Sequence, residues 1–149
     1  MEHIKYTYPE FMEDCEELER LVLPYIRMDL PNLRQICAIP RGGYIPGVCL
    51  AHRLSGHAGR QISVWPPAIF TSVTVGSKDP IIIIDDIYDK GTTITQTVRH
   101  FKKLGYVRII GLALLSRVVR DEPLKTEWNV NLLHARAIDT HSWVDFWWG

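Results

Sequence analysis

Apolar side chains recur at helical spacing along the first part of the chain. The steps of three and four residues join Phe11, Cys15, Leu18, Val22, Tyr25 and Ile26. This pattern predicts an amphipathic helix, and the spacing of Thr7 and Glu10 suits a capping box at its start. Pro24 is expected to kink or end the helix.

The next elements are predicted from short apolar runs and from the breaks between them. Gln35–Ile39 predicts a strand, and after the sequence PRGG the residues from Tyr44 to Leu54 again have helical character. Gln61–Val64 predicts a second strand, followed by a loop or irregular hairpin that closes at Gly76. The chain thus alternates strand, helix and strand.

The clearest strand is Ile81–Ile84, four β-branched residues in a row between Pro80 and Asp85. Such a run is typical of a central parallel strand that is buried on both faces. A helix is expected next, capped by Thr92 or Thr93, with its apolar stripe and its glycine stop at Ile94, Val98, Phe101, Leu104 and Gly105.

The last third of the chain predicts two more strands. Val107–Leu115 is a long apolar run, and a short strand near Leu132–Leu133 follows the polar connection Arg120–Glu127. Strands and helices therefore alternate, and the predicted fold is α/β, with a parallel sheet flanked by helices in one domain over residues 1–149.

Composition removes several functional classes. The 149 residues carry no formal net charge and no run of Lys or Arg, so binding to nucleic acid is not expected. No apolar stretch approaches the ~20 residues that span a bilayer, and the N-terminus lacks the pattern of a signal peptide. Cys15, Cys37 and Cys49 show no CxxC spacing, so we expect a cytoplasmic protein without a membrane partner.

Chemistry concentrates directly after the isoleucine strand. Asp85, Asp86 and Asp89 gather at a strand's carboxyl end, where open α/β sheets bind ligands. The sequence Lys90-Gly91-Thr92-Thr93 then begins a helix, whose free N–H groups and dipole favour an anion. The pair of acids could instead merely cap a helix, and Gly-Thr-Thr could be an ordinary loop. Their direct succession favours a site for a phosphate beside a polyol or metal.

The segment IIIIDDIYDKGTT resembles the phosphoribosyl pyrophosphate (PRPP) signature of the type I phosphoribosyltransferases. The resemblance implies that Asp85 and Asp86 hold the ribose hydroxyls, directly or through Mg²⁺, and that Lys90–Thr93 wraps the 5-phosphate. Asp89 would lie near the purine N7 as general base or proton partner. Lys90 replaces the family's usual Thr and Thr92 its usual Gly, but neither change removes the backbone donors.

A second loop, AIPRGGYIPG from Ala38 to Gly47, follows the first strand of the sheet. A bare Arg-Gly-Gly is more often a simple turn, although two glycines permit close approach to a ligand and Arg suits phosphate. The family has a similar loop that binds pyrophosphate, so the resemblance implies this role for Arg41, Gly42 and Gly43. Pro40 replaces a small polar residue at a position where the family often has a cis peptide.

The chain ends in DTHSWVDFWWG, which is dense in aromatic residues. A terminal segment docked on the domain or a subunit interface would explain it. Purine phosphoribosyltransferases have a C-terminal hood with a similar pattern, matched by Trp143, Val144, Asp145 and Trp148. The resemblance implies a core of about residues 1–130 and a hood of about 131–149, with Trp143 stacking on the base and the Val144 carbonyl reading its edge. Arg117 falls where relatives contact the purine 6-oxo group.

The resemblance implies an enzyme that transfers ribose 5-phosphate between PRPP and a purine base with Mg²⁺, and a homo-oligomer, either dimer or tetramer. The loop Trp65–Lys78 would cover the site, with Ser72 and Lys78 as partial replacements for the family's Ser-Tyr pair. A non-catalytic regulator that senses PRPP or nucleotides would keep the same loop. A phosphohydrolase or receiver-like domain would need a distant Lys partner instead.

Overall fold

The computed structural model describes residues 2–70, 80–117, 130–139 and 141–149. Within them the elements follow in the order β1 (His3–Tyr6), α1 (Tyr8–Ile26), the 3-10 helix η1 (Arg27–Asn32), β2 (Gln35–Ala38), α2 (Tyr44–Ala58), β3 (Ser63–Trp65), the 3-10 helix η2 (Pro67–Ile69), β4 (Ile81–Tyr88), α3 (Thr92–Lys103), β5 (Ile109–Ser116), β6 (Asn131–Ala137) and β7 (Trp143–Phe146).

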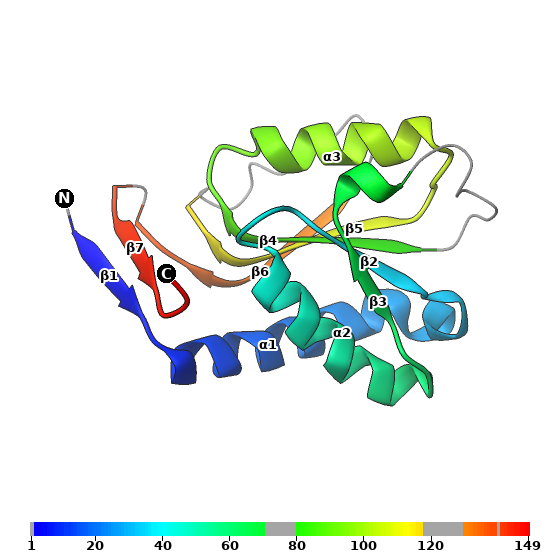
Figure 1. The fold of residues 1–149 in the computed structure, drawn as a ribbon, viewed down its shortest axis with the longest axis horizontal. Helices are drawn as coiled ribbons and strands as arrows, with labels where there is room; N and C mark the ends of the chain where they lie inside the picture. Colours follow the sequence, from blue (N-terminus) through cyan, green and yellow to red (C-terminus); the bar gives the residue numbers. More distant parts are fainter. Residues whose placement is uncertain (1, 71–79, 118–129, 140) are drawn as a thin grey trace.

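Five of the described strands form one parallel sheet in the order β3-β2-β4-β5-β6. Helix α3 covers one face, and α1 and α2 cover the other (Figure 1). Strand β4 lies at the centre because its neighbours β2 and β5 cover both of its edges. The expectation of an α/β fold with a parallel sheet flanked by helices is confirmed.

The isoleucine strand divides its side chains between two cores. Ile82 and Ile84 join the core under α1 and α2, whereas Ile81 and Ile83 join the core under α3. All four are at most 1% exposed, and burial of each side chain contributes roughly 1.5–3 kcal/mol. The β4 strand is thereby fixed from both faces, which holds its carboxyl end in place.

Helix α1 begins as the sequence predicts. The Thr7 hydroxyl accepts a hydrogen bond from the backbone N–H of Glu10, and the Glu10 side chain completes the capping box. Pro24 does not break the helix at once, because α1 continues to Ile26 before the 3-10 turn begins. The predicted stripe is buried apart from Tyr25, which is 42% exposed near the end of the helix.

Helix α3 begins differently from the prediction. Thr92 and Thr93 lie inside the helix, and the N-cap is Gly91, which makes no side-chain cap. Gly91 has a φ of 83°, a left-handed conformation that glycine adopts without strain. The predicted threonine cap is therefore wrong, since the tight turn requires glycine at the cap position. The predicted stop is confirmed, because Gly105 has a φ of 99° just beyond the helix.

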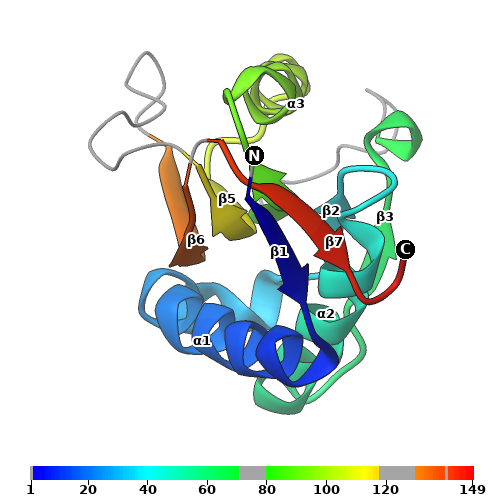
Figure 2. The same ribbon diagram turned by 90° about the vertical axis from the view of Figure 1, so that its left-hand side faces the viewer.

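A second, small sheet joins the two ends of the chain. β1 pairs in parallel with β7, so that Ile4 lies opposite Val144 (Figures 1 and 2). The small sheet thus joins residues 3–6 to the end of the segment predicted as a hood, whereas β6, at the start of that segment, belongs to the main sheet. Aromatic rings from both ends pack together under this sheet, namely Tyr6, Tyr8, Phe11, Phe146, Trp147 and Trp148.

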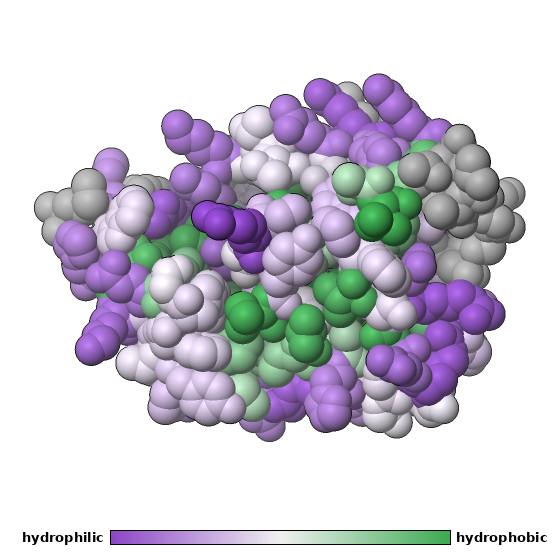
Figure 3. Space-filling model, viewed as in Figure 1, coloured by the Kyte–Doolittle hydropathy of each residue, from purple (hydrophilic) through white to green (hydrophobic). Residues whose placement is uncertain are grey.

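Apolar side chains also reach the surface. The face in Figure 3 shows them gathered over α2 and η2. Ile45 and Val48 in α2, Trp65 at the end of β3 and Ile69 in η2 are each 38–58% exposed. No helix in the described part of the chain combines the length and apolar character needed to cross a membrane.

Candidate functional site

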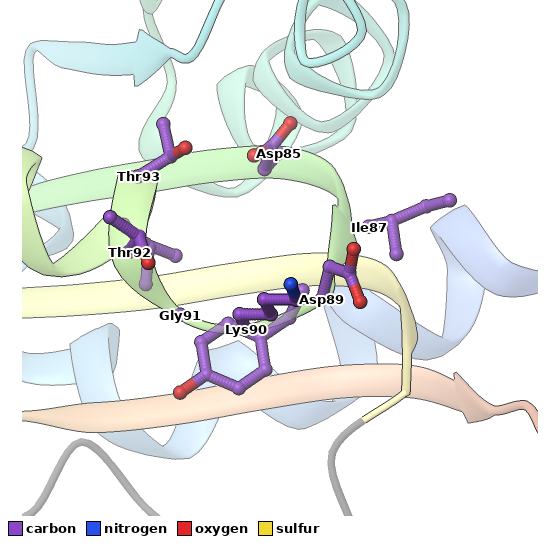
Figure 4. A pocket seen from close by; sticks show the side chains of 9 residues that line it. Asp85, Ile87, Asp89, Lys90, Gly91, Thr92 and Thr93 are labelled. Carbon is purple, nitrogen blue, oxygen red and sulfur yellow. The ribbon is translucent and has the colours of Figure 1, made fainter. Parts of the chain in front are cut away.

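A pocket of about 220 Å³ lies where β4 meets α3 (Figure 4). β4 extends to Tyr88, four residues beyond the predicted strand, so Asp85 and Asp86 are strand residues and Asp89 follows directly. The residues that line the pocket are Asp85, Ile87, Tyr88, Asp89, Lys90, Gly91, Thr92, Thr93 and Ile94. Two of the three predicted acids and the entire predicted phosphate loop therefore share one cavity.

The two adjacent acids, Asp85 and Asp86, lie against different loops. Successive residues of a strand point to opposite faces, and Asp85 accordingly lines the α3 pocket while Asp86 does not. Asp86 instead lies against the loop before α2, because a Cβ added to Gly42 would sit 2.0 Å from the Asp86 Oδ2 atom. The pair thus joins the β4–α3 turn to the β2–α2 loop.

Electrostatics at this pair favours a bound cation or a proton. Burial, followed by the neighbouring Asp86 carboxyl, raises the pKa of Asp85 to about 8. One Asp85 oxygen accepts the backbone N–H of Asp86 at 2.8 Å, and Asp86 accepts that of Ile87 at 2.7 Å. These bonds orient the carboxyls, but they do not remove the repulsion between two half-buried negative charges.

The turn after β4 has the geometry of an anion cradle. Gly91 packs directly on the ring of Tyr88, since an added Cβ would lie 2.5 Å from the Tyr88 hydroxyl. Thr92 and Thr93 are exposed in the first turn of α3, where the backbone N–H groups have no partner within the helix. Figure 4 shows both threonines at the helix start, with Asp85 on the adjoining strand.

The PRGG loop is bound tightly to the end of β4. The Ile39 N–H donates to the Ile84 carbonyl at 2.9 Å, and the Gly43 N–H donates to the Ile39 carbonyl at 2.9 Å. A Cβ on Gly43 would lie 2.5 Å from the Ile84 carbonyl oxygen, so the backbone itself fills the space. Arg41 is exposed, and the peptide bond that links it to Pro40 is cis. Both predicted loops therefore lie at the same edge of the sheet.

Arg117 connects the Asp89 turn to the hood. Its Nη2 donates to the Ser142 carbonyl at 2.7 Å, and its Nη1 lies 3.7 Å from the Asp89 Oδ2. Its backbone N–H donates to the Tyr88 carbonyl at 2.9 Å. The side chain is 15% exposed, and its Nε is buried with no hydrogen-bond partner among the described residues. Arg117 is therefore held in place rather than being a free surface charge.

The hood residues lie at the other end of this connection. Trp143 directly follows Ser142 and is 55% exposed, and its ring N–H donates to Asp145 at 3.0 Å. Val144 is buried under the small sheet. Neither residue is among the described residues that line the pocket, and the contacts between this segment and Asp89 run through Ser142 and Arg117.

Sequence reasoning did not identify Tyr88 and Ser142 as site residues. The Tyr88 ring packs against Gly91, and the Ser142 carbonyl accepts the hydrogen bond that holds Arg117 in place. Tyr88 stands inside the recognised motif, which was an available signal, whereas only the three-dimensional structure reveals Ser142. The loop candidates Ser72 and Lys78 lie outside the described residues.

The carboxyl pair has the chemistry that Mg²⁺ requires. Mg²⁺ prefers hard oxygen ligands and usually binds through one or two carboxylates plus waters and phosphates. Asp85 and Asp86 fit this pattern, and a cation would offset both the burial and the neighbouring Asp86 carboxyl, which together raise the pKa of Asp85. Among the described residues no group of three or more His, Cys, Asp or Glu side chains could hold a metal, so further ligands would come from substrate and water.

No protein-family sequence model matches the chain, and no curated protein sequence matches it significantly. Solved structures do match its fold. One is a hypothetical protein from Neisseria gonorrhoeae with bound ppGpp, at a TM-score of 0.74 and 15% identity, covering 99% of this chain and 89% of that one.

Two enzymes are also similar in structure. A purine phosphoribosyltransferase from Pyrococcus horikoshii matches at a TM-score of 0.67 and 21% identity, covering 100% of this chain and 95% of that one. The xanthine-guanine-hypoxanthine phosphoribosyltransferase of Helicobacter pylori matches at 0.66 and 19% identity, covering 98% and 92%. The chain therefore has the type I phosphoribosyltransferase fold. At these identities the similarity shows the fold alone.

Proposed function

We propose that the protein transfers ribose 5-phosphate from PRPP to the nitrogen of a purine base and releases pyrophosphate. The observation that carries this proposal is the pocket in which Asp85 and Asp89 lie beside the Lys90–Thr93 helix start. A carboxylate suits the hydroxyls of a sugar, and a helix N-terminus suits its phosphate. One cavity thus offers complementary groups to both ends of a phosphorylated ribose.

The two loops would bind different anionic groups of PRPP. The N–H groups and hydroxyls of Lys90–Thr93 would hold the 5-phosphate, and Arg41 with Gly42 and Gly43 would hold the pyrophosphate. Asp86 contacts the second loop, so the ribose acids and the pyrophosphate loop are positioned together. A bound Mg²⁺ would neutralise charge on the departing pyrophosphate, and Asp85 and Asp86 are the residues that would hold it.

Asp89 would act on the base. It is 56% exposed at the end of the strand, and the Arg117 Nη1 lies 3.7 Å from its Oδ2. An ionised Asp89 can accept a proton from the base nitrogen or stabilise positive charge that develops on the ribose ring. Catalysis would then depend mainly on position and charge, with no covalent nucleophile.

The hood would bind the base. Trp143 presents an exposed ring for stacking, and the Val144 carbonyl is a candidate reader of the base edge. The Arg117 Nη2 is already bound to the Ser142 carbonyl, so contact with a 6-oxo group would use Nη1, which lies 3.7 Å from the Asp89 Oδ2. Replacement with Lys would keep the charge but lose the forked geometry that bridges these groups.

The decisive experiment is incubation of the full chain with Mg²⁺ and PRPP against guanine, xanthine, hypoxanthine, adenine and orotate, following nucleotide and pyrophosphate together. We expect stoichiometric formation of both products with at least one purine and none without Mg²⁺. The matched control is Asp85→Asn/Asp86→Asn, which should abolish the reaction. PRPP binding without product from any base would contradict the proposed catalysis.

A second candidate function is a non-catalytic sensor of PRPP or of a nucleotide. The similar Neisseria structure with bound ppGpp favours it, because a guanine nucleotide with several phosphates presents a base and anions, as PRPP and a purine do together. Calorimetry with ppGpp, guanosine monophosphate and PRPP separates the candidates. Tight binding of ppGpp, together with no turnover, would support the sensor.

We also propose a homo-oligomer, either a dimer or a tetramer. The exposed apolar residues Ile45 and Val48 on α2, with Trp65 and Ile69, are the surface that a second copy would cover. Light scattering coupled to size exclusion measures the mass directly. A monomer at all tested concentrations would refute this part of the proposal.

A further inference from the structure

Helices α1 and α2 bring two of the three cysteines into contact. Cys15 lies on the buried face of α1 and is 0% exposed, whereas Cys49 lies on α2 and is partly exposed. Their side chains share a hydrogen bond, and neither is in a disulfide. The third cysteine, Cys37, is 0% exposed in the core under α3, on the other side of the sheet. Cys37 is therefore an internal control for the behaviour of Cys15 and Cys49.

Charged residues hold the two helices together one turn beyond the cysteines. Glu19 follows Cys15 by four residues and Arg53 follows Cys49 by four, so each lies on the same helix face as its cysteine. The Arg53 Nη1 is 2.9 Å from one Glu19 oxygen, and the His57 Nε2 is 2.7 Å from the other. These contacts fix the alignment of the helices one turn from the cysteines, where Cys49 packs against the core cluster that contains Cys15.

The environment makes the two thiols unequal. The hydrogen bond from Cys15 and then the Arg53 guanidinium lower the pKa of Cys49, although burial opposes them. The hydrogen bond to Cys49 and then burial raise the pKa of Cys15. Burial also raises the pKa of Cys37 to about 12. The thiol whose pKa is lowered is therefore also the one that solvent can reach.

We propose that Cys49 is a site of oxidation by peroxide and that Cys15 resolves it, forming a disulfide that joins α1 to α2. In the first step the Cys49 thiolate attacks one peroxide oxygen and the O–O bond breaks, giving a sulfenic acid and hydroxide, which takes a proton to become water. In the second step the Cys15 sulfur attacks the Cys49 sulfur, the S–O bond breaks, and the hydroxyl leaves as water with the Cys15 proton. The two thiols lose two electrons, which reduce one hydrogen peroxide to two waters.

The bond would connect two functional parts of the fold. Gly43 of the PRGG loop is the N-cap of α2, and α1 carries Phe11, which packs against Trp147 and Trp148. A covalent link between these helices removes conformations from the unfolded chain and stabilises their docking. This inference depends on the α1–α2 contact and is independent of the proposed catalytic function.

The test is peptide mapping of the folded full chain after hydrogen peroxide treatment and alkylation of the remaining thiols. We expect a Cys15–Cys49 linked peptide that dithiothreitol removes, with Cys37 still reduced. The oxidised protein should unfold at a Tm higher by roughly 5 °C or more than the reduced protein.

Variants separate the roles of the three thiols. Cys49→Ala should abolish oxidation of Cys15, whereas Cys15→Ala should leave Cys49 to accumulate sulfenic and then sulfinic acid. Cys37→Ala is the matched control and should still form the link. If Cys15 and Cys49 remain reduced in the folded wild type, or link to Cys37 or between chains as readily as to each other, the inference is wrong. Because that result is read on the wild type, it does not depend on the variants folding.

Discussion

The β4–α3 junction and the small β1–β7 sheet differ in how far apart along the chain their residues lie. The junction draws its acids and its anion cradle from residues 85–93, one continuous stretch behind a fully buried strand. The small sheet draws on residues 3–6 and 143–146, and its rings come from both chain ends. Arg117 connects the two regions through Asp89 and Ser142. The junction is therefore built from one local stretch of the chain, whereas the small sheet depends on residues from both ends.

The sharpest test of the junction is Asp89→Asn, with the largest expected effect. Loss of the carboxylate that accepts or stabilises a proton should lower kcat by roughly 10²- to 10⁴-fold. PRPP affinity, measured by calorimetry, should change only a few fold, because the amide keeps the size and the backbone contacts of the side chain. Equal losses in turnover and PRPP affinity would assign Asp89 to binding instead.

The next effect concerns the contact between the two loops. Gly42→Ala places a Cβ where the Asp86 carboxylate now lies, at 2.0 Å from its Oδ2, so that carboxylate must turn away. We expect a loss of PRPP affinity on the order of 10- to 100-fold, with a smaller change in Tm, since a short side chain and not backbone is displaced.

Gly56→Ala is its matched control. Gly56 lies in α2 with no other atom within 4 Å of an added Cβ. The substitution should stabilise the helix by about 0.5–1 kcal/mol and leave PRPP binding unchanged. An affinity for PRPP that falls equally in both variants would show that the Gly42 contact with Asp86 is not the cause.

The hood is tested by Trp143→Ala. Loss of a stacking ring is worth about 1–3 kcal/mol per base, so KM for the base should rise roughly 5- to 100-fold while PRPP affinity is retained. The Tm should change little, because Trp143 is 55% exposed.

Trp147→Ala is the contrasting variant, at the residue that directly follows β7. Its ring packs on Tyr8 at 5.2 Å and Phe11 at 5.6 Å between centroids, so truncation should lower the Tm. Its effect on KM for the base should be smaller than that of Trp143→Ala. A larger effect of Trp147→Ala than of Trp143→Ala on KM would place the base against Trp147 instead.

The smallest expected effect is a pH dependence of stability without ligand. The pKa of Asp85 is about 8 in the folded chain and lies near 4 when unfolded, so the native state binds one more proton between these values. Stability from this group is therefore complete below about pH 4 and is lost as pH rises to about 8. Asp85→Asn should raise the Tm at pH 8 by roughly 3–6 °C and leave it unchanged at pH 4.

The exposed carboxyl variant Glu16→Gln is the control for this measurement, and it should show no such difference between the two pH values. Mg²⁺ with PRPP should also reduce the effect in the wild type, because a bound cation stabilises the ionised carboxyl. A Tm of Asp85→Asn that parallels the wild type at every pH would mean that Asp85 titrates normally.

Much of the fold could be predicted because its signals are local. The isoleucine run identified the central strand, and the capping box identified the start of α1. The strand lengths and the cap of α3 could not be predicted in this way. The run of buried isoleucines ends at Ile84 although the strand continues to Tyr88, and the cap depends on a backbone angle that only the turn over the Tyr88 ring imposes.

For the candidate site, the sequence by itself determined the order of the chemical groups: a buried strand, two acids, a third acid and a glycine-threonine turn. These groups are neighbours along the chain, so their order is the same wherever the strand lies in the fold. Only the tertiary structure decided that Asp86 meets Gly42, that Arg117 bonds to the Ser142 carbonyl, and that both chain ends form one sheet. These contacts join residues separated by tens of positions or more, and chain packing, which no local pattern encodes, brings them together.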